Sequence, residues 1–134
     1  MHSKISFLFF IGKKVYVVCD FSNLKGKTFV DVVVSDDNEE VLFVVSDNEK
    51  YKLFHSQDCC ESVTIESIVG DVKDLIGAEI LIADEATSGN ANEVYDADEM
   101  WTFYKLATVK GYVDIRWYGS SNGYYSIEVS FARV

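Results

Sequence analysis

The most reactive side chains of the sequence stand together in one short polar stretch. His55, Asp58 and Glu61 flank two adjacent cysteines, Cys59 and Cys60. All of these residue types ligate zinc, but structural zinc sites usually space their thiols about two to four residues apart. A cysteine nucleophile would need one thiol within hydrogen-bonding reach of the imidazole. We therefore expect no metal and no catalytic residue in this stretch.

The same stretch has a simpler structural interpretation. Free cysteines are usually buried and inert, and a bond between adjacent cysteines has unfavourable geometry. We predict that one cysteine packs inward and that Asp58 or Glu61 caps a turn. A polar ligand would then meet His55, Asp58 and Glu61 at the end of a strand, where loops often carry function.

A second group of candidate residues surrounds Arg116, which Trp117 and Tyr118 follow directly. An arginine can bind a phosphate or carboxylate while neighbouring rings, here those of Phe103, Tyr118 and Tyr124, stack on a base. The alternative is a cross-strand ion pair between Arg116 and Glu128. Both interpretations place Arg116 on a face rich in aromatic residues.

Strands must position both groups. Residues 29–35, 41–46 and 50–55 are β-rich runs separated by short polar turns, which predicts a three-stranded meander that ends at His55. Residues 101–109, 112–118 and 124–131 predict a second one. A three-residue loop at 121–123 would pair Trp117 with Ile127 and bury one consistent face.

The other segments complete an α+β fold dominated by antiparallel sheet. Residues 71–77 have an N-cap residue, apolar positions and a final glycine, which predicts one short helix. Residues 84–99 hold six acids and no lysine or arginine, which predicts a long acidic loop. We expect a single domain over 24–134, preceded by a strand-forming N-terminal extension, 1–23. The apolar run in that extension is short for a secretion signal.

Composition limits the partners. The chain has 134 residues, with 12 basic and 22 acidic side chains and a net charge of −10. Free nucleic acid is therefore an unfavourable partner, whereas a basic protein surface is a favourable one. No apolar run reaches the ~18 residues that span a membrane, so no membrane association is expected. Three cysteines form no even disulfide framework, which indicates a reducing, cytoplasmic setting. A homo-oligomer is compatible with the sequence.

Several motifs resemble those of a known family. They are Leu24-x-Gly26-Lys27, His55-x-Gln57-Asp58-Cys59-Cys60-Glu61-x-Val63, Val69-Gly70-Asp71, Trp101-Thr102-Phe103-Tyr104-Lys105-Leu106-Ala107-Thr108, Ile115-Arg116-Trp117-Tyr118-Gly119 and Ser121-Asn122-Gly123-Tyr124-Tyr125-Ser126. Together they look like a family of small uncharacterised phage and bacterial proteins, a domain of unknown function. The resemblance begins near Leu24 and supplies no catalytic residue or cofactor. It implies a phage-type setting, in which small proteins blunt host defence.

These observations lead to three functional hypotheses. The first is a non-enzymatic protein that sequesters a small, nucleotide-like ligand. Its binding residues would be His55, Asp58, Glu61, Phe103, Arg116, Tyr118 and Tyr124. The second is an acidic inhibitor that binds a basic host protein through residues 84–99. The third is a cysteine-dependent enzyme.

Overall fold

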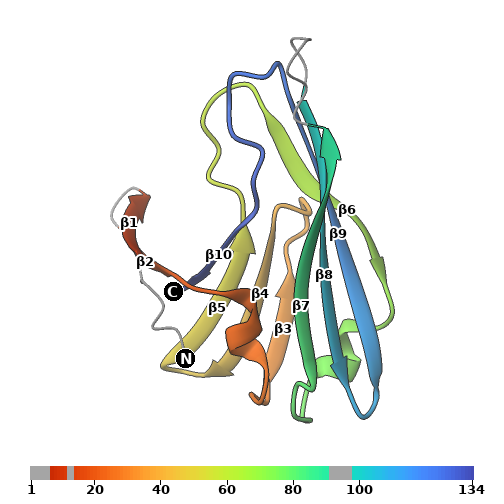
Figure 1. Ribbon diagram of the computed structural model, residues 1–134. Coiled ribbons are helices and arrows are strands. Elements are labelled where there is room, and N and C mark those ends of the chain that lie inside the picture. The colour runs from red at the N-terminus through yellow and green to blue at the C-terminus, as the bar shows by residue number, and fades with distance from the viewer. Residues whose placement is uncertain (1–6, 12–13, 91–97) are drawn as a thin grey trace, which may run out of the picture.

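Two antiparallel β-sheets face each other in the protein (Figure 1). The computed structural model describes residues 7–11, 14–90 and 98–134. The six-stranded sheet has the order β1-β2-β10-β5-β4-β3 and the four-stranded sheet has the order β6-β9-β8-β7. The strands of the first sheet are β1 Phe7–Ile11, β2 Lys14–Val18, β3 Asp31–Val34, β4 Glu40–Ser46, β5 Glu49–Phe54 and β10 Ser130–Arg133. Those of the second are β6 Ser62–Val69, β7 Ile82–Asn90, β8 Asp98–Thr108 and β9 Gly111–Ser121.

The predicted α+β class is wrong, because the described residues contain no α-helix and the fold is all-β. The segment predicted as a helix forms only a short 3-10 turn, η2 Val72–Leu75. Asp71 caps it by accepting a hydrogen bond from the Lys73 N–H, and the chain then turns at Gly77, whose φ is +80°. A capping residue and a terminal glycine occur at the ends of 3-10 turns as well as α-helices. The four residues of η2 are too few to form a stable α-helix.

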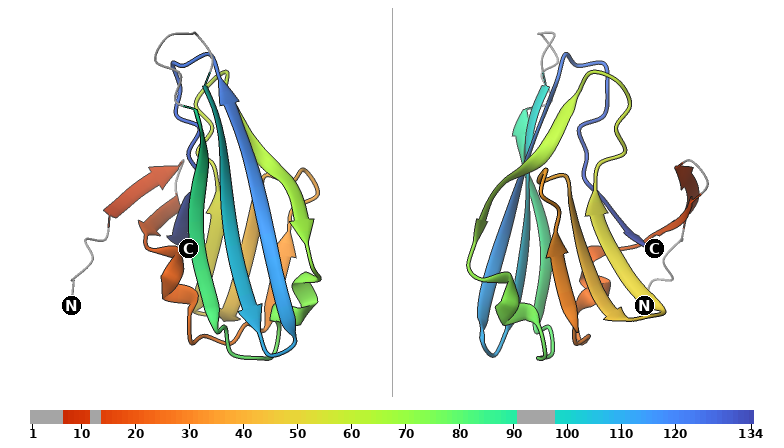
Figure 2. Two further views of the ribbon diagram at one scale, coloured as in Figure 1. Left: turned by 45° about the vertical axis from the view of Figure 1, so that its right-hand side comes forward. Right: turned by 180° about the vertical axis from the view of Figure 1, so that it is seen from behind.

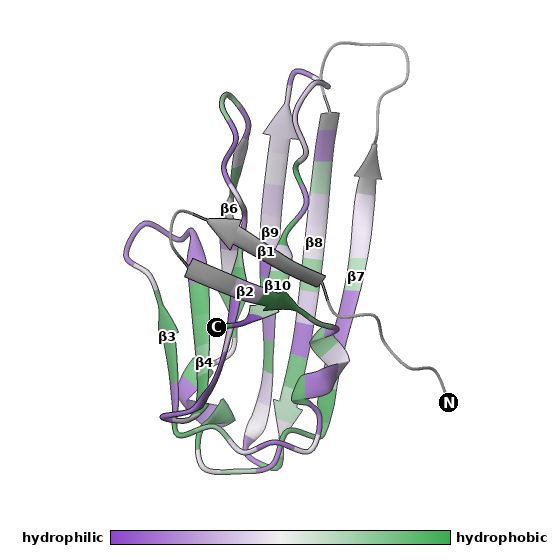
Figure 3. Cartoon of the chain, turned by 90° about the vertical axis from the view of Figure 1, so that its left-hand side faces the viewer, coloured by the Kyte–Doolittle hydropathy of each residue, from purple (hydrophilic) through white to green (hydrophobic). Residues whose placement is uncertain are grey.

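The first predicted meander is confirmed. β3, β4 and β5 pair as consecutive antiparallel neighbours, with Val32 opposite Phe43 and Val41 opposite Leu53. All four of these side chains are buried against the other sheet. Figure 3 shows the resulting hydrophobic stretch along β4, whereas β8 and β9 alternate hydrophobic and hydrophilic residues.

The second predicted meander is only partly correct. β8 and β9 form a hairpin, in which Leu106 lies opposite Val113 and both side chains are buried. The prediction of a third strand over 124–131 beside β9 was wrong, because β6 pairs with β9 there. The chain leaves β9, turns at Gly123 with φ +89°, and pairs again only as β10, with β5 and β2 of the other sheet. The predicted pairing of Trp117 with Ile127 therefore does not form.

The prediction of an acidic loop over 84–99 was also wrong, because all of its described residues lie in strands β7 and β8. Ile82–Asn90 is strand β7, which pairs with β8. Residues 91–97 lie outside the described residues. Edge strands often carry charged side chains that discourage pairing with another chain, so an acid-rich sequence is compatible with an edge position such as that of β7.

A short turn before the first meander joins the two sheets. This turn, η1 Phe21–Leu24, buries Phe21 to 2 % exposure. The centroid of the Phe21 ring lies 4.7 Å from that of Tyr104 in β8 and 5.2 Å from that of Phe131 in β10. Figure 2 shows that β1 stands away from the sandwich, whereas β2 continues into η1 and pairs with β10.

Candidate functional site

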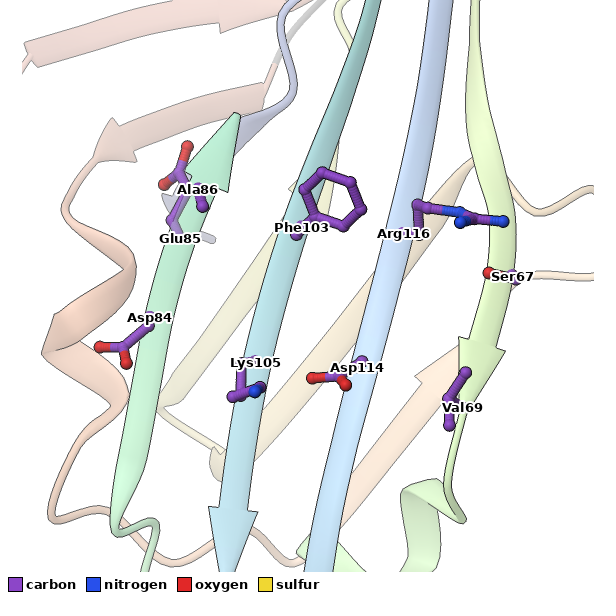
Figure 4. Close-up of a pocket in the computed structure, with 9 residues that line it drawn as sticks. All are labelled: Ser67, Val69, Asp84, Glu85, Ala86, Phe103, Lys105, Asp114 and Arg116. Atoms are coloured by element: carbon purple, nitrogen blue, oxygen red, sulfur yellow. The ribbon is translucent and has the colours of Figure 1, made fainter. Parts of the chain in front are cut away.

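The exposed side of the four-stranded sheet, here called the outer face, carries a groove. The groove has a volume of about 510 Å³ and takes residues from all four strands of the sheet (Figure 4). Its lining residues are Ser67, Val69, Asp84, Glu85, Ala86, Phe103, Lys105, Asp114 and Arg116. Strict alternation along β8 and β9 places Phe103, Lys105, Asp114 and Arg116 on this face, because their sequence neighbours point into the core.

Phe103 and Arg116 are cross-strand neighbours in the middle of this groove. Phe103 is 37 % exposed, which is unusual for a phenylalanine and leaves its ring available for stacking. Figure 4 shows the ring standing over β8, with the Arg116 side chain extending toward β6. The pair therefore combines a planar apolar surface with a cation that donates hydrogen bonds.

Arg116 is held by an acid that the sequence interpretation did not name. Its Nε donates to Glu66 Oε1 at 2.8 Å. The alternative of a cross-strand pair with Glu128 is wrong, because β6 and β8 are the neighbours of β9 and place Ser67 and Phe103 opposite Arg116. The register between β6 and β9 shifts between Ile65 and Ser67. Because of this bulge, the backbone of Glu66 has no directly opposite residue on β9. Bulges commonly redirect side chains in this way. Both side chains remain partly exposed, so a ligand can still reach the guanidinium.

A second pair of rings lies next to the groove. Trp101 and Tyr118 are cross-strand neighbours on the outer face, with ring centroids 5.1 Å apart. The Tyr118 hydroxyl donates to Glu99 Oε1 at 3.0 Å. Burial and this carboxylate raise the pKa of Tyr118, so its hydroxyl remains a donor at neutral pH.

Acidic side chains outnumber basic ones around the groove. Lys105 lies directly between Asp84 and Asp114 in the register of the sheet. Burial raises the pKa of Glu85; a hydrogen bond from Tyr104 opposes the shift, and nearby Glu128 adds to it. This charge distribution favours a ligand with few negative charges.

The loops at one end of the sandwich form a separate structure, here called the loop end, which comprises residues 55–61 and 121–129. His55 connects its two segments. The Nδ1 atom of His55 lies 2.7 Å from the carbonyl oxygen of Glu128, and Nε2 lies 2.6 Å from Glu61 Oε2. Each ring nitrogen is therefore within hydrogen-bonding distance of an oxygen atom, and the imidazole holds the two segments together.

Glu61 organises the turn around its buried carboxylate. The carboxylate accepts hydrogen bonds from the Asp58 N–H at 2.8 Å and the Cys59 N–H at 3.0 Å. Burial raises the pKa of Glu61, but the hydrogen bonds from His55, Cys59 and Asp58 outweigh that effect and lower it to about 2. The prediction that Asp58 or Glu61 caps the turn is thus confirmed for Glu61.

The two adjacent cysteines differ from the sequence expectation. Cys59 and Cys60 are bonded to each other, and both are exposed. The prediction of one inward-packed cysteine, without a bond between the two, was therefore wrong. The inward position of the turn is occupied by the Glu61 carboxylate and its hydrogen bonds, which leave both cysteines on the solvent side.

Close packing at Gly119 keeps the loop end in place. A Cβ atom at Gly119 would lie 2.9 Å from the carbonyl oxygen of Ile127 and 3.0 Å from its Cβ. We expect Gly119→Ala to lower the free energy of unfolding by about 1–3 kcal/mol, because the loop must move to admit the methyl group. Urea unfolding measures this effect, with the neighbouring Ser120→Ala as control. Equal stability of the two variants would contradict the close packing.

The structure divides the predicted binding residues between two places. Phe103, Arg116 and Tyr118 lie together on the outer face. His55, Asp58, Glu61 and Tyr124 belong to the loop end. Of these, the His55 and Glu61 side chains are only 5 % and 0 % exposed and bind each other, whereas Tyr124 is 81 % exposed. The predicted set therefore does not form one site.

Sequence reasoning missed several lining residues of the groove. Ser67 and Val69 were overlooked because the bulge at Glu66 interrupts the alternation that marks β6 as a long strand. Asp84 and Ala86 were assigned to a loop. A detectable signal was present in β8 and β9, where Lys105 and Asp114 follow the same alternation as Phe103 and Arg116.

Two general features complete the description of the site. Among the described residues, no group of three or more His, Cys, Asp or Glu side chains is arranged to hold a metal ion. Within the same residues, no helix has the length and apolar character needed to cross a membrane.

Comparison with known proteins gives a family match but no functional relative. Residues 22–131 match a family described as a domain of unknown function (DUF7448). No curated protein and no solved structure matches the chain. The family match covers every residue of the groove and of the loop end.

Proposed function

Because the chain belongs to the DUF7448 family of domains of unknown function, its role has to be inferred from the site, and we propose that it is a non-enzymatic binding protein. Its ligand is small, planar and nucleotide-like, and it occupies the groove on the outer face. The observation that carries this proposal is the exposed Phe103 ring beside Arg116 in a groove of about 510 Å³. Stacking on an aromatic ring contributes about 1–3 kcal/mol per base.

The charges of the groove narrow the ligand class. Arg116 and Lys105 supply two cations, while Asp84, Glu85 and Asp114 supply three acids. A ligand with a small total phosphate charge can bond to Arg116 without bringing many negative charges close to the carboxylates. We therefore expect a nucleoside monophosphate or a cyclic dinucleotide to bind more tightly than a nucleoside triphosphate.

The resemblance to small phage and bacterial proteins supports a biological setting for this binding. Sequestering a nucleotide signal in the host cytoplasm would blunt a defence response. The alternative of a cysteine-dependent enzyme receives no support from the loop end, where both ring nitrogens of His55 are engaged by Glu61 and Glu128.

Two substitutions test the ligand site. We expect Phe103→Ala and Arg116→Ala each to raise the Kd for adenosine monophosphate or a cyclic dinucleotide by about tenfold or more, since each removes one of the two main contacts. Isothermal titration calorimetry measures the Kd. Tyr112→Ala is the matched control, because Tyr112 is also exposed on β9 but does not line the groove.

Two results would overturn this assignment. One is wild-type affinity in both groove variants, which would move the ligand elsewhere. The other is absence of binding for every nucleotide tested. Absence of nucleotide binding would favour the second candidate function, which is docking on a basic host protein. The exposed acids Asp84, Glu85 and Glu99 on strands β7 and β8 support that function. Such docking should weaken sharply with added salt.

A further inference from the structure

The bond between Cys59 and Cys60 differs from a structural disulfide in what it encloses. A disulfide stabilises a fold mainly by closing a chain loop in the unfolded state, and the effect grows with loop length. Here the two cysteines are adjacent, with a sequence separation of 1. The bond therefore restricts almost none of the unfolded chain, and stabilisation of the fold does not explain it.

The turn that carries this bond is held by other contacts. Glu61 binds the N–H groups of Asp58 and Cys59, and the Gln57 side chain donates to the carbonyl oxygen of Glu61 at 2.6 Å. His55 ties the same carboxylate to the neighbouring loop through Glu128. None of these hydrogen bonds uses a cysteine sulfur, so the turn can keep its shape when the sulfur–sulfur bond opens.

The bond between the two cysteines is accessible from solvent. Cys59 and Cys60 are both exposed, whereas the carboxylate beneath them is buried. A thiol reagent can therefore approach the bond without unfolding the protein. The third cysteine, Cys19, lies in a different part of the fold, next to β10, and takes no part in the bond.

We propose that Cys59 and Cys60 form a reversible thiol–disulfide exchange site for dithiol reductants. A thiolate of the dithiol attacks one cysteine sulfur, the sulfur–sulfur bond breaks, and the other cysteine leaves as a thiolate that takes up a proton. The second thiol of the reductant loses its proton and attacks the mixed disulfide. The reductant is thereby oxidised to its own disulfide, and both cysteines become thiols after accepting two electrons and two protons in total.

Thiol labelling with intact-mass analysis tests this proposal in the Cys19→Ser variant of the full chain, whose only cysteines are the pair. We expect no maleimide label before treatment, two labels after dithiothreitol, and none after reoxidation with oxidised glutathione. The Tm should change by less than about 2 °C throughout, because the bond closes no loop. The Cys60→Ser form of this variant is the control. It should carry one label before treatment and one after dithiothreitol, and oxidised glutathione should convert its lone thiol into a mixed disulfide that adds one glutathione to the intact mass.

Three outcomes would overturn the proposal. Labelling before any reductant would show that the bond is not formed in the protein. Resistance of the folded protein to excess dithiothreitol would show that the sulfurs are not accessible. Unfolding upon reduction, or in the Cys60→Ser variant, would show that the bond has a structural role instead.

Discussion

Phe21→Ala should lower the free energy of unfolding by about 3–5 kcal/mol, the usual loss for truncating a buried aromatic residue. The Phe21 ring contacts Tyr104 in one sheet and Phe43 and Phe131 in the other. Its removal leaves a cavity at the junction between the two sheets, and their β-strands are too regular to close it completely. Urea unfolding followed by tryptophan fluorescence measures the loss.

The matched control for this prediction is Phe103→Ala. Phe103 has the same side chain but is 37 % exposed on the outer face, so its removal should lower the free energy of unfolding by only about 1 kcal/mol. This control also verifies that the variant used to test ligand binding is folded. Similar losses for both variants would contradict the position of Phe21 between the sheets.

Glu61→Gln should lower the Tm at neutral pH by about 5 °C or more, because the ionised carboxylate that orders the loop end is lost. The same substitution should also make the stability of the fold less sensitive to low pH. The pKa of Glu61 is lowered from 4.5 to about 2 in the folded protein. Its ionised form therefore stabilises the fold fully above pH 4.5, and that stabilisation is lost as the pH falls toward 2.

Thermal unfolding at several pH values between 2 and 7 measures this difference. The wild-type Tm should fall more steeply than the Glu61→Gln Tm below about pH 4.5. Asp58→Asn is the control, since it removes an exposed carboxylate from the same turn and should retain the wild-type slope. Parallel curves for wild type and Glu61→Gln would contradict the lowered pKa.

Local pattern was sufficient to predict several elements of the fold. The turns between β3, β4 and β5, and the alternation along β8 and β9, depend on neighbouring residues and on the two-residue period of a strand. The same alternation placed Phe103, Arg116 and Tyr118 on one exposed face. The role of Glu61 as a cap was predictable for the same reason, since the N–H groups that it binds belong to the same turn.

Tertiary structure decided which strands are neighbours and which polar groups are buried. The sequence near Ile127 is compatible with a strand beside β9, but β6 pairs with β9 there instead. After β9, the chain next forms a strand at β10, which belongs to the other sheet. His55 and Glu61 looked like ligand-binding residues because nothing local reveals that Glu128, 73 residues from His55, accepts its second hydrogen bond. Long-range pairing depends on competition between distant segments, which no local pattern records.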